Sequence, residues 1–243
     1  MRSPAIRRLL PLAALLLPAP ALADTTARYA AGQAIFTVEV DDGGNARAGI
    51  DGRFALIRRD GVIYVVLYPR DGAPQVARAD AVLTLMGEVS KPPETWRTEF
   101  TAEGDATVAG YRGSVWRFGP AGDPPLEFLM SADPALAPVG AVFRGAADVL
   151  AAFIAAHVTE GDPVGDVRSL FSHGTPIRLR ETRPGGGDIL TLQSVGTGEI
   201  DSHRFDLPGP VAGADAFVAA IRPMGAPIVD EGTTVTTVPP PRP

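Results

Sequence analysis

The stretch FALIRRDGVIYVVLY, residues 54–68, is the part of the sequence that decides the fold. A predicted strand starts at Phe54 and ends at Arg58-Arg59. Asp60-Gly61 follows, and this dipeptide between two β-rich runs is the strongest short signal for a hairpin. The second run, Val62 to Tyr68, is apolar on both of its faces. We therefore expect one face of that strand to meet the core and the other to meet a helix or a cavity.

Further strands are predicted on both sides of this hairpin. Residues 34–40 alternate with period two, and turn residues follow at 41–45. Later runs have the same pattern: 96–100, 114–118, 126–131, 177–182 and 189–195. Glycines around 108–113 indicate a tight turn or the start of a strand. These spacings predict an antiparallel meander.

Helices are predicted to be few. The main one runs from about Val142 to His157, because apolar residues form a stripe at helical spacing there. Short helices are predicted over Asp80–Met86 and Ala214–Arg222, and Asp133-Pro134 has the pattern of a helix start. The sequence therefore predicts an α+β fold. Its curved antiparallel β-sheet, or incomplete barrel, would wrap over one long and one or two short helices.

The first 23 residues have the pattern of a secretory signal peptide. Three arginines precede an uncharged run from Leu9 to Ala23, which ends in the small-x-small site Ala21-Leu22-Ala23. The alternative, a membrane anchor, is less favoured because the run is short and broken by prolines. We expect cleavage after Ala23 and export to the periplasm of a Gram-negative bacterium. No transmembrane span is expected after cleavage.

The remainder of the chain is predicted to form a single domain, residues 24–231. The end of the chain, residues 232–243, is rich in Pro and Thr and is expected to be a disordered tail.

Composition excludes several classes of protein. The chain has 243 residues, 45% of them hydrophobic and 21% charged, which are globular values. It has no cysteine, which removes disulfides, thiol catalysis, zinc fingers and iron–sulfur clusters. The formal net charge of −6 becomes more negative when the signal arginines are removed, so nucleic acid is not an expected partner.

The search for catalytic motifs is negative. The sequence has no nucleophile elbow, no H-E-x-x-H, no P-loop and no complete G-x-G-x-x-G. We therefore expect no enzyme, no cofactor and no metal. One alternative stays open: a hydrolase whose Ser/His/Asp site is assembled by the fold around His173, which follows Ser172, or His203, which follows Asp201-Ser202.

The aromatic residues are the candidate ligand-binding set. Most of them fall on predicted strands, where they either fill the core or line an apolar cavity between sheet and helix. The cavity candidates are Tyr64, Tyr68, Trp96, Trp116, Phe118, Phe128 and Phe153.

Four passages together give the chain a family resemblance. They are the hairpin segments 52–57 and 60–64, the run Val108–Trp116, the strand Gly174–Leu179 and the segment Ile200–Pro208. In this order they resemble the periplasmic lipoprotein carrier (LolA-like) superfamily, over about Ala30 to Pro210. The resemblance implies an incomplete antiparallel barrel over helices, an apolar cavity and no catalysis.

Two functions follow as hypotheses beside the hydrolase. The first is an exported, non-enzymatic binding protein for an apolar or amphipathic ligand, such as a lipid or an acylated molecule, or for an envelope protein. The second is an envelope structural or interaction protein whose core is filled.

Overall fold

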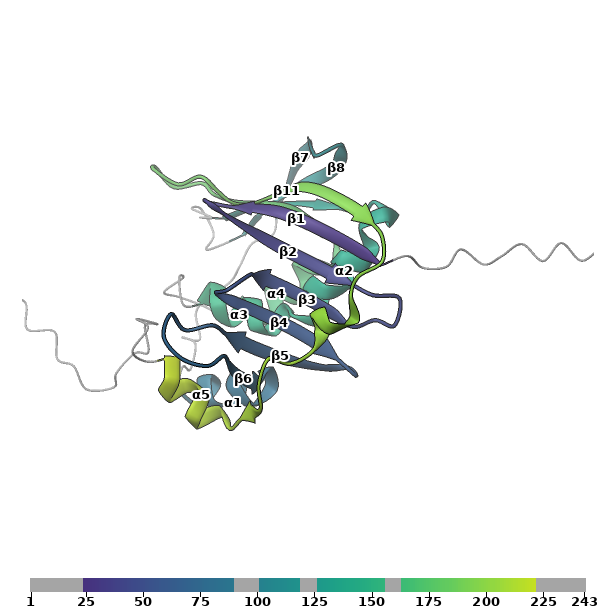
Figure 1. Cartoon of the computed structure of the whole chain (residues 1–243). Helices are drawn as coiled ribbons and strands as arrows, with labels where there is room; N and C mark the ends of the chain where they lie inside the picture. Colours follow the sequence, from purple (N-terminus) through teal and green to yellow (C-terminus); the bar gives the residue numbers. More distant parts are fainter. Residues whose placement is uncertain (1–23, 90–100, 119–125, 156–162, 222–243) are drawn as a thin grey trace, which may run out of the picture.

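The computed structural model describes residues 24–89, 101–118, 126–155 and 163–221. Its backbone forms one curved, unclosed sheet of twelve strands (Figure 1). The strand order is β12-β6-β5-β4-β3-β2-β1-β11-β10-β9-β8-β7, and all neighbours pair antiparallel except β12 and β6. The predicted fold class, α+β with a curved open antiparallel sheet, is confirmed.

The strands divide into two groups along the chain. The first group is β1 (Thr25–Ala31), β2 (Ala34–Val40), β3 (Ala46–Ile50), β4 (Phe54–Arg59), β5 (Val62–Leu67) and β6 (Gln75–Arg78). The second is β7 (Thr101–Val108), β8 (Tyr111–Phe118), β9 (Leu126–Ser131), β10 (Thr175–Glu181), β11 (Asp188–Thr197) and β12 (Val211–Ala212). Apart from β12, which pairs with β6, the two groups join where β11 pairs with β1, so the last long strand lies beside the first.

The predicted hairpin is present as β4 and β5. Arg59 pairs with Val62, and the turn residues Asp60 and Gly61 have φ of 51° and 76°. Two successive positive φ values are the geometry of the tight turn that matches the twist of the flanking strands. The turn predicted around Gly110 is also present, between β7 and β8, with φ of 50° at Ala109 and 85° at Gly110.

The helices differ from the prediction in number and in length. They are α1 (Ala79–Val89), α2 (Ala137–Gly145), α3 (Ala147–Ala155), α4 (Pro163–Ser172) and α5 (Ala214–Ile221), with short 3₁₀ turns η1 (Pro134–Leu136) and η2 (Ser202–Phe205). The predicted short helices correspond to α1 and α5. The predicted cap is confirmed at η1, because the Asp133 side chain accepts from the Ala135 amide at 2.9 Å.

The single long helix predicted over Val142–His157 is wrong. The helix starts at Ala137 and breaks at Ala146, which has φ −94° and ψ 7°. Gly145 stands directly before the break, and glycine is a poor helix former. The apolar stripe continues through the break because α3 resumes the cover of the same sheet, so periodicity alone did not reveal it. The last two residues of the predicted helix lie outside the described residues.

The inner face of the sheet is the face that α2, α3 and α4 cover, as Figure 1 shows. Tyr29 on β1 is fully buried there, with its ring edge-on to Phe36 at 6.1 Å and to Phe143 of α2 at 6.0 Å. The Tyr29 hydroxyl donates to the Pro176 carbonyl of β10 at 3.0 Å. Burial raises the pKa of Tyr29, so the phenol stays protonated and keeps this hydrogen bond.

The outer face carries a second apolar cluster and is crossed by a long segment. The cluster consists of Ala55, Ile57, Val66 and Val76, with Tyr64, Tyr68 and Leu207 packed against it. Residues 198–212, which we call the strap, run from the end of β11 over this face to α5 (Figure 1). The strap brings η2 against β3 and β4. No helix among the described residues is long and apolar enough to cross a membrane.

Replacing Tyr29 with Phe tests the buried hydrogen bond. The Tyr29→Phe change leaves the Pro176 carbonyl buried without its donor, and an unsatisfied buried group costs about 1–3 kcal/mol. We expect the free energy of unfolding in urea to fall by that amount. Tyr64→Phe on the half-buried outer cluster is the control and should change it by less than about 0.5 kcal/mol. An equal fall in the free energy of unfolding for the two variants would contradict a stabilising hydrogen bond between Tyr29 and Pro176.

The strap predicts a pH dependence of stability. Nδ1 of His203 lies 2.8 Å from Oδ2 of Asp206. This hydrogen bond, with the charges of Asp201 and Asp206, raises the pKa of His203 above its ordinary 6.5. The folded state thus favours the protonated imidazole, and the resulting stability is fully present below 6.5 and lost as pH rises through the raised pKa.

Urea unfolding between about pH 6 and pH 8 measures this contribution. The free energy of unfolding of the unmodified chain should fall more with rising pH than that of the His203→Gln chain. Asp206→Asn should flatten the profile in the same way. Parallel profiles for all three chains would show that the pair contributes nothing.

Candidate binding cleft

A cleft of about 490 Å³ opens on the inner face of β8 and β9, beside the end of α4. It lies where the chain leaves α4 at Ser172 and enters β10 at Thr175. Residues from β7, β8, β9, the β9–η1 link and the α4–β10 link meet there. They are Asp105, Arg112, Gly113, Ser114, Trp116, Met130, Ala132, Asp133 and His173.

An aromatic pair forms the apolar wall of the cleft. The Trp116 and His173 rings stack with centroids 4.0 Å apart and planes 19° apart. Trp116 is held on β8, where it pairs with Phe128 of β9. His173 follows α4 directly, and its amide donates to the Leu170 carbonyl at 3.0 Å. The indole Nε1 is buried and has no hydrogen-bond partner among the described residues.

A polar group forms a second wall of the cleft, next to the aromatic pair along β8. Asp105 of β7 accepts from Nη2 of Arg112 at 2.6 Å and from the Ser114 hydroxyl at 3.0 Å. The hydrogen bond from Arg112, followed by that from Ser114, lowers the pKa of Asp105. This carboxylate is therefore charged at neutral pH, and it faces solvent beside its arginine.

Close backbone packing holds β8, β9 and β10 together beneath the cleft. A Cβ at Gly113 would lie 2.7 Å from the Met130 carbonyl oxygen. Gly174 has a φ of 141°, and a Cβ there would overlap the Ser131 carbonyl oxygen. The buried Ser131 hydroxyl donates to the Arg112 carbonyl at 2.7 Å. These contacts hold the backbones of β8 and β9, which carry Trp116 and Met130, against the start of β10. We call this part of the sheet the cleft floor.

Between β9, α2 and α4, the interior is packed with aromatic side chains. Phe143 lies 5.8 Å from Phe171 of α4, and Phe171 meets Phe128 edge-on at 6.5 Å, measured between ring centroids. The space beside Val142 and Ala146, where α2 breaks, measures about 10 Å³. That is room for about one water molecule. Of these two spaces in the part of the chain that the structure describes, the cleft has the volume of a ligand site.

The structure describes the side chains of four of the seven aromatic candidates, and these four lie in two places. Trp116 lines the cleft and Phe128, its cross-strand partner, is buried beneath α4. Tyr64 and Tyr68 lie in the apolar cluster of the outer face. Trp96 lies outside the described residues, and so do the side chains of Phe118 at the end of β8 and Phe153 on α3. Of the four candidates whose side chains the structure describes, Trp116 and Phe128 are thus brought together on the inner face.

The residues of the hydrolase alternative fall in two places. His203 pairs with Asp206 on the outer face, and the Ser172 hydroxyl donates to the Ser169 carbonyl at 2.6 Å. His173 shares the cleft with Ser114 and Asp105. There the serine donates to the carboxylate and the imidazole stacks on Trp116. A catalytic triad needs the imidazole between the hydroxyl and the carboxylate, and this arrangement differs.

Sequence reasoning missed the polar side of the cleft and a charged cluster on the outer face. Asp105 and Arg112 lie on either side of a predicted turn, and a cross-strand charge pair at that turn was the available signal. The charged cluster of the outer face consists of Glu39, Arg47, Asp51 and Arg204. Glu39 and Arg47 each interrupt an apolar strand, but Arg204, which pairs with Glu39, is remote in the sequence. Among the described residues, no group of His, Cys, Asp and Glu is arranged to hold a metal ion.

Comparison with known proteins yields distant structural likenesses. No family model and no curated protein matches the sequence. Among solved structures, the chain is similar to "Crystal structure of MucB" at 16% identity and a TM-score of 0.29, covering 77% of this chain and 58% of that one. It is similar to "Crystal structure of MucB in complex with MucA(peri)" at 15% identity and a TM-score of 0.31, covering 79% and 56%.

A third structure, "The complex structure of Pseudomonas aeruginosa MucA/MucB", matches at 14% identity and a TM-score of 0.30, covering 77% and 56% of the two chains. The chain therefore spans less than two thirds of the length of each of these structures. The LolA-like resemblance of the sequence stays a prediction of family.

Replacing Gly174 with Ala tests the cleft floor. The new methyl group would overlap the Ser131 carbonyl oxygen in a backbone conformation that L-residues rarely adopt. We expect the free energy of unfolding to fall by at least about 2 kcal/mol. Gly187→Ala is the matched control, because a Cβ there meets nothing within 4 Å. A Gly174→Ala chain as stable as the control would show that the floor is not tightly packed.

Proposed function

We propose that this protein is an exported, non-enzymatic binding protein of the periplasm, which holds an amphipathic ligand or a segment of an envelope partner in its cleft. The observation that carries the proposal is the contrast between the two spaces. The cleft measures about 490 Å³, whereas the space beneath α2 measures about 10 Å³. Sites for small ligands fall in a range of about 300–1,000 Å³.

The chemistry of the two walls supports an amphipathic occupant. The Trp116–His173 stack and Met130 offer an aromatic and apolar surface. Arg112 offers guanidinium hydrogens, and Asp105 and Asp133 offer carboxylate oxygens. A ligand with a flat apolar part and a polar end satisfies both walls, because each part meets surface of its own kind.

The filled interior supports a binding place different from the one that the resemblance implies. An acyl chain enclosed beneath the helices would have to displace the packed rings of Phe143 and Phe171. Displacing close-packed core side chains is costly. We therefore assign the occupant to the cleft. The periplasmic location rests on the predicted signal peptide, which mass spectrometry of the exported chain tests directly.

Trp116 provides the readout for a binding experiment. The chain has two tryptophans, so Trp96→Phe leaves Trp116 as its single indole. We expect 1-anilinonaphthalene-8-sulfonate, which has an aromatic part and an anionic end, to bind this chain saturably and to quench Trp116 by energy transfer. Adding His173→Ala should weaken binding about tenfold, since losing one aromatic contact costs about 1.4 kcal/mol.

The matched control replaces a histidine on the opposite face. His203→Ala in the same Trp96→Phe background should leave the affinity within about twofold. Circular dichroism establishes that each chain is folded. Equal affinity in the His173→Ala and His203→Ala chains would refute the cleft as the site. A copurified lipid that survives the His173→Ala change, seen by native mass spectrometry, would place binding elsewhere.

A further inference from the structure

The strap is attached to the sheet in an unusual way. At its start, the Gly198 and Ile200 amides donate to the carbonyl and the carboxylate of Asp24, at 3.1 and 2.7 Å. At its end, β12 pairs with β6. Between these points, the described residues show backbone hydrogen bonds within the strap and none from residues 201–210 to a strand. Side chains therefore hold the middle of the strap.

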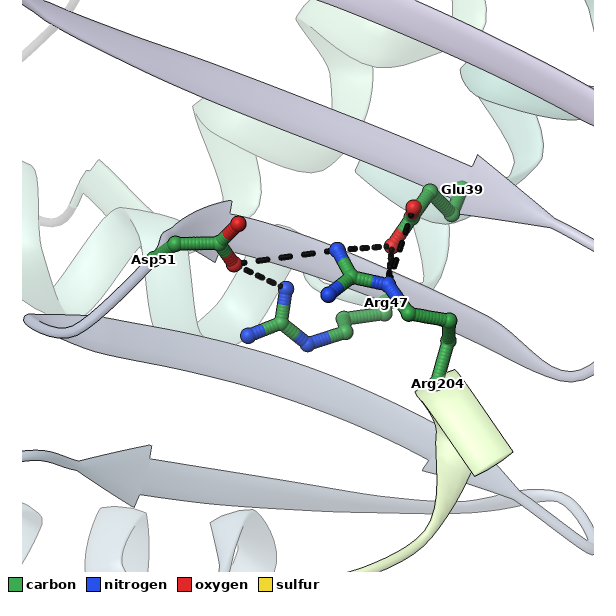
Figure 2. A network of polar contacts seen from close by, with 4 residues as sticks. All are labelled: Glu39, Arg47, Asp51 and Arg204. Atoms are coloured by element: carbon green, nitrogen blue, oxygen red, sulfur yellow. Dashed lines mark hydrogen bonds and ion pairs between the residues drawn. The ribbon is translucent and has the colours of Figure 1, made fainter. Parts of the chain in front are cut away.

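A cluster of charged groups holds the first of these side chains. Arg204 donates to both carboxylate oxygens of Glu39, with N–O distances of 2.9 to 3.1 Å. Asp51 lies 3.7 Å from the same guanidinium and 2.7 Å from Arg47, as Figure 2 shows. Glu39 and Arg47 are only 9% and 6% exposed. A nearly buried carboxylate of the sheet thus binds the arginine of the strap.

The next three strap residues also meet groups that suit them. Phe205 is buried, with 3% of its surface exposed. Asp206 accepts from Nη1 of Arg59 on β4 at 2.9 Å. Leu207 packs on the outer apolar cluster around Ile57 and Val66. Of four consecutive residues, the cation, the acid and the aliphatic therefore each contact a complementary feature of the sheet, and the aromatic residue between them is buried.

We propose that the outer face of β2–β5 is a docking site for an extended polypeptide, which the strap occupies in the chain itself. The sheet residues that hold the strap are Glu39, Arg59 and those of the outer apolar cluster. Recognition by side chains at fixed positions is what a peptide site requires, and charge order sets its direction. A partner segment with the order cation–aromatic–acid–aliphatic fits the same surface once the strap is displaced.

The test supplies the strap as a separate peptide. The full chain carrying Arg204→Ala and Phe205→Ala keeps the sheet surface but loses the main strap contacts. A fluorescein-labelled peptide with the sequence of residues 199–210 should bind this chain saturably, as measured by anisotropy. It should bind the unmodified chain at least tenfold more weakly, because the attached strap competes at high effective concentration.

Two controls isolate the charge order. In one, a peptide with Arg204 and Asp206 exchanged should bind at least tenfold more weakly than the native order. In the other, adding Glu39→Gln to the double variant should remove the preference between the two peptides. Equal binding of both peptides to the double variant, or equal binding of the native peptide to the unmodified and double-variant chains, would overturn the proposal.

Hydrogen exchange of the unmodified chain tests the proposal without any substitution. Amides of residues 201–207 should exchange at least tenfold faster than those of β3 and β4. When excess native peptide is added, exchange in the strap should become faster, whereas the exchange rates of β3 and β4 should not change. Strap amides that exchange only together with β3 and β4 would show that the strap opens by global unfolding alone, and the docking site would then be rejected.

Discussion

The rest of the structure depends on the burial of the inner sheet face beneath α2, α3 and α4. A single open sheet has two faces, and this one has only a few short helices to cover the inner one. Tyr29 stands at the centre of that contact, because its ring touches residues of β2 and α2 while its hydroxyl reaches β10. Aromatic rings bury large areas in a thin layer, so the layer is filled without long helices. The same filling leaves the ligand-sized space at the rim, beside the end of α4.

The two faces of the sheet are satisfied by different means. Inside, apolar side chains from both layers interdigitate, and a buried hydroxyl such as that of Thr175 finds a carbonyl, here that of Leu136 at 3.0 Å. Outside, a segment with little regular structure covers apolar residues through salt bridges and one buried ring. The packing of the inner face depends on the shapes of the side chains. The contacts of the strap on the outer face depend on the order of its charged residues. The two faces therefore differ in the kind of contact that covers them.

Local signals in the sequence predicted the parts of the fold that local physics controls. Asp60-Gly61, the cap at Asp133 and the short helix after Gly213 depend on neighbours a few residues away, and all three are present. β3 was missed because its Ala-Arg-Ala-Gly-Ile sequence has low strand propensity and is a strand only by pairing with β2 and β4. Trp116 was found as an aromatic candidate and His173 was weighed separately. Their stacking depends on the placement of β8 beside the link from α4 to β10, which no local pattern contains.

The pairing of β1 with β11 has a consequence for the time at which the chain can fold. Thr25 pairs with Thr197, and Asp24 holds the start of the strap, so the two halves of the sheet join only when both ends of the domain are available. Contacts between residues so distant in sequence form late and slowly, because the intervening chain must first be ordered. A nascent chain that lacks β11 has an unpaired β1 and an incomplete inner face. It therefore stays incompletely folded until β11 has been synthesised and can pair with β1.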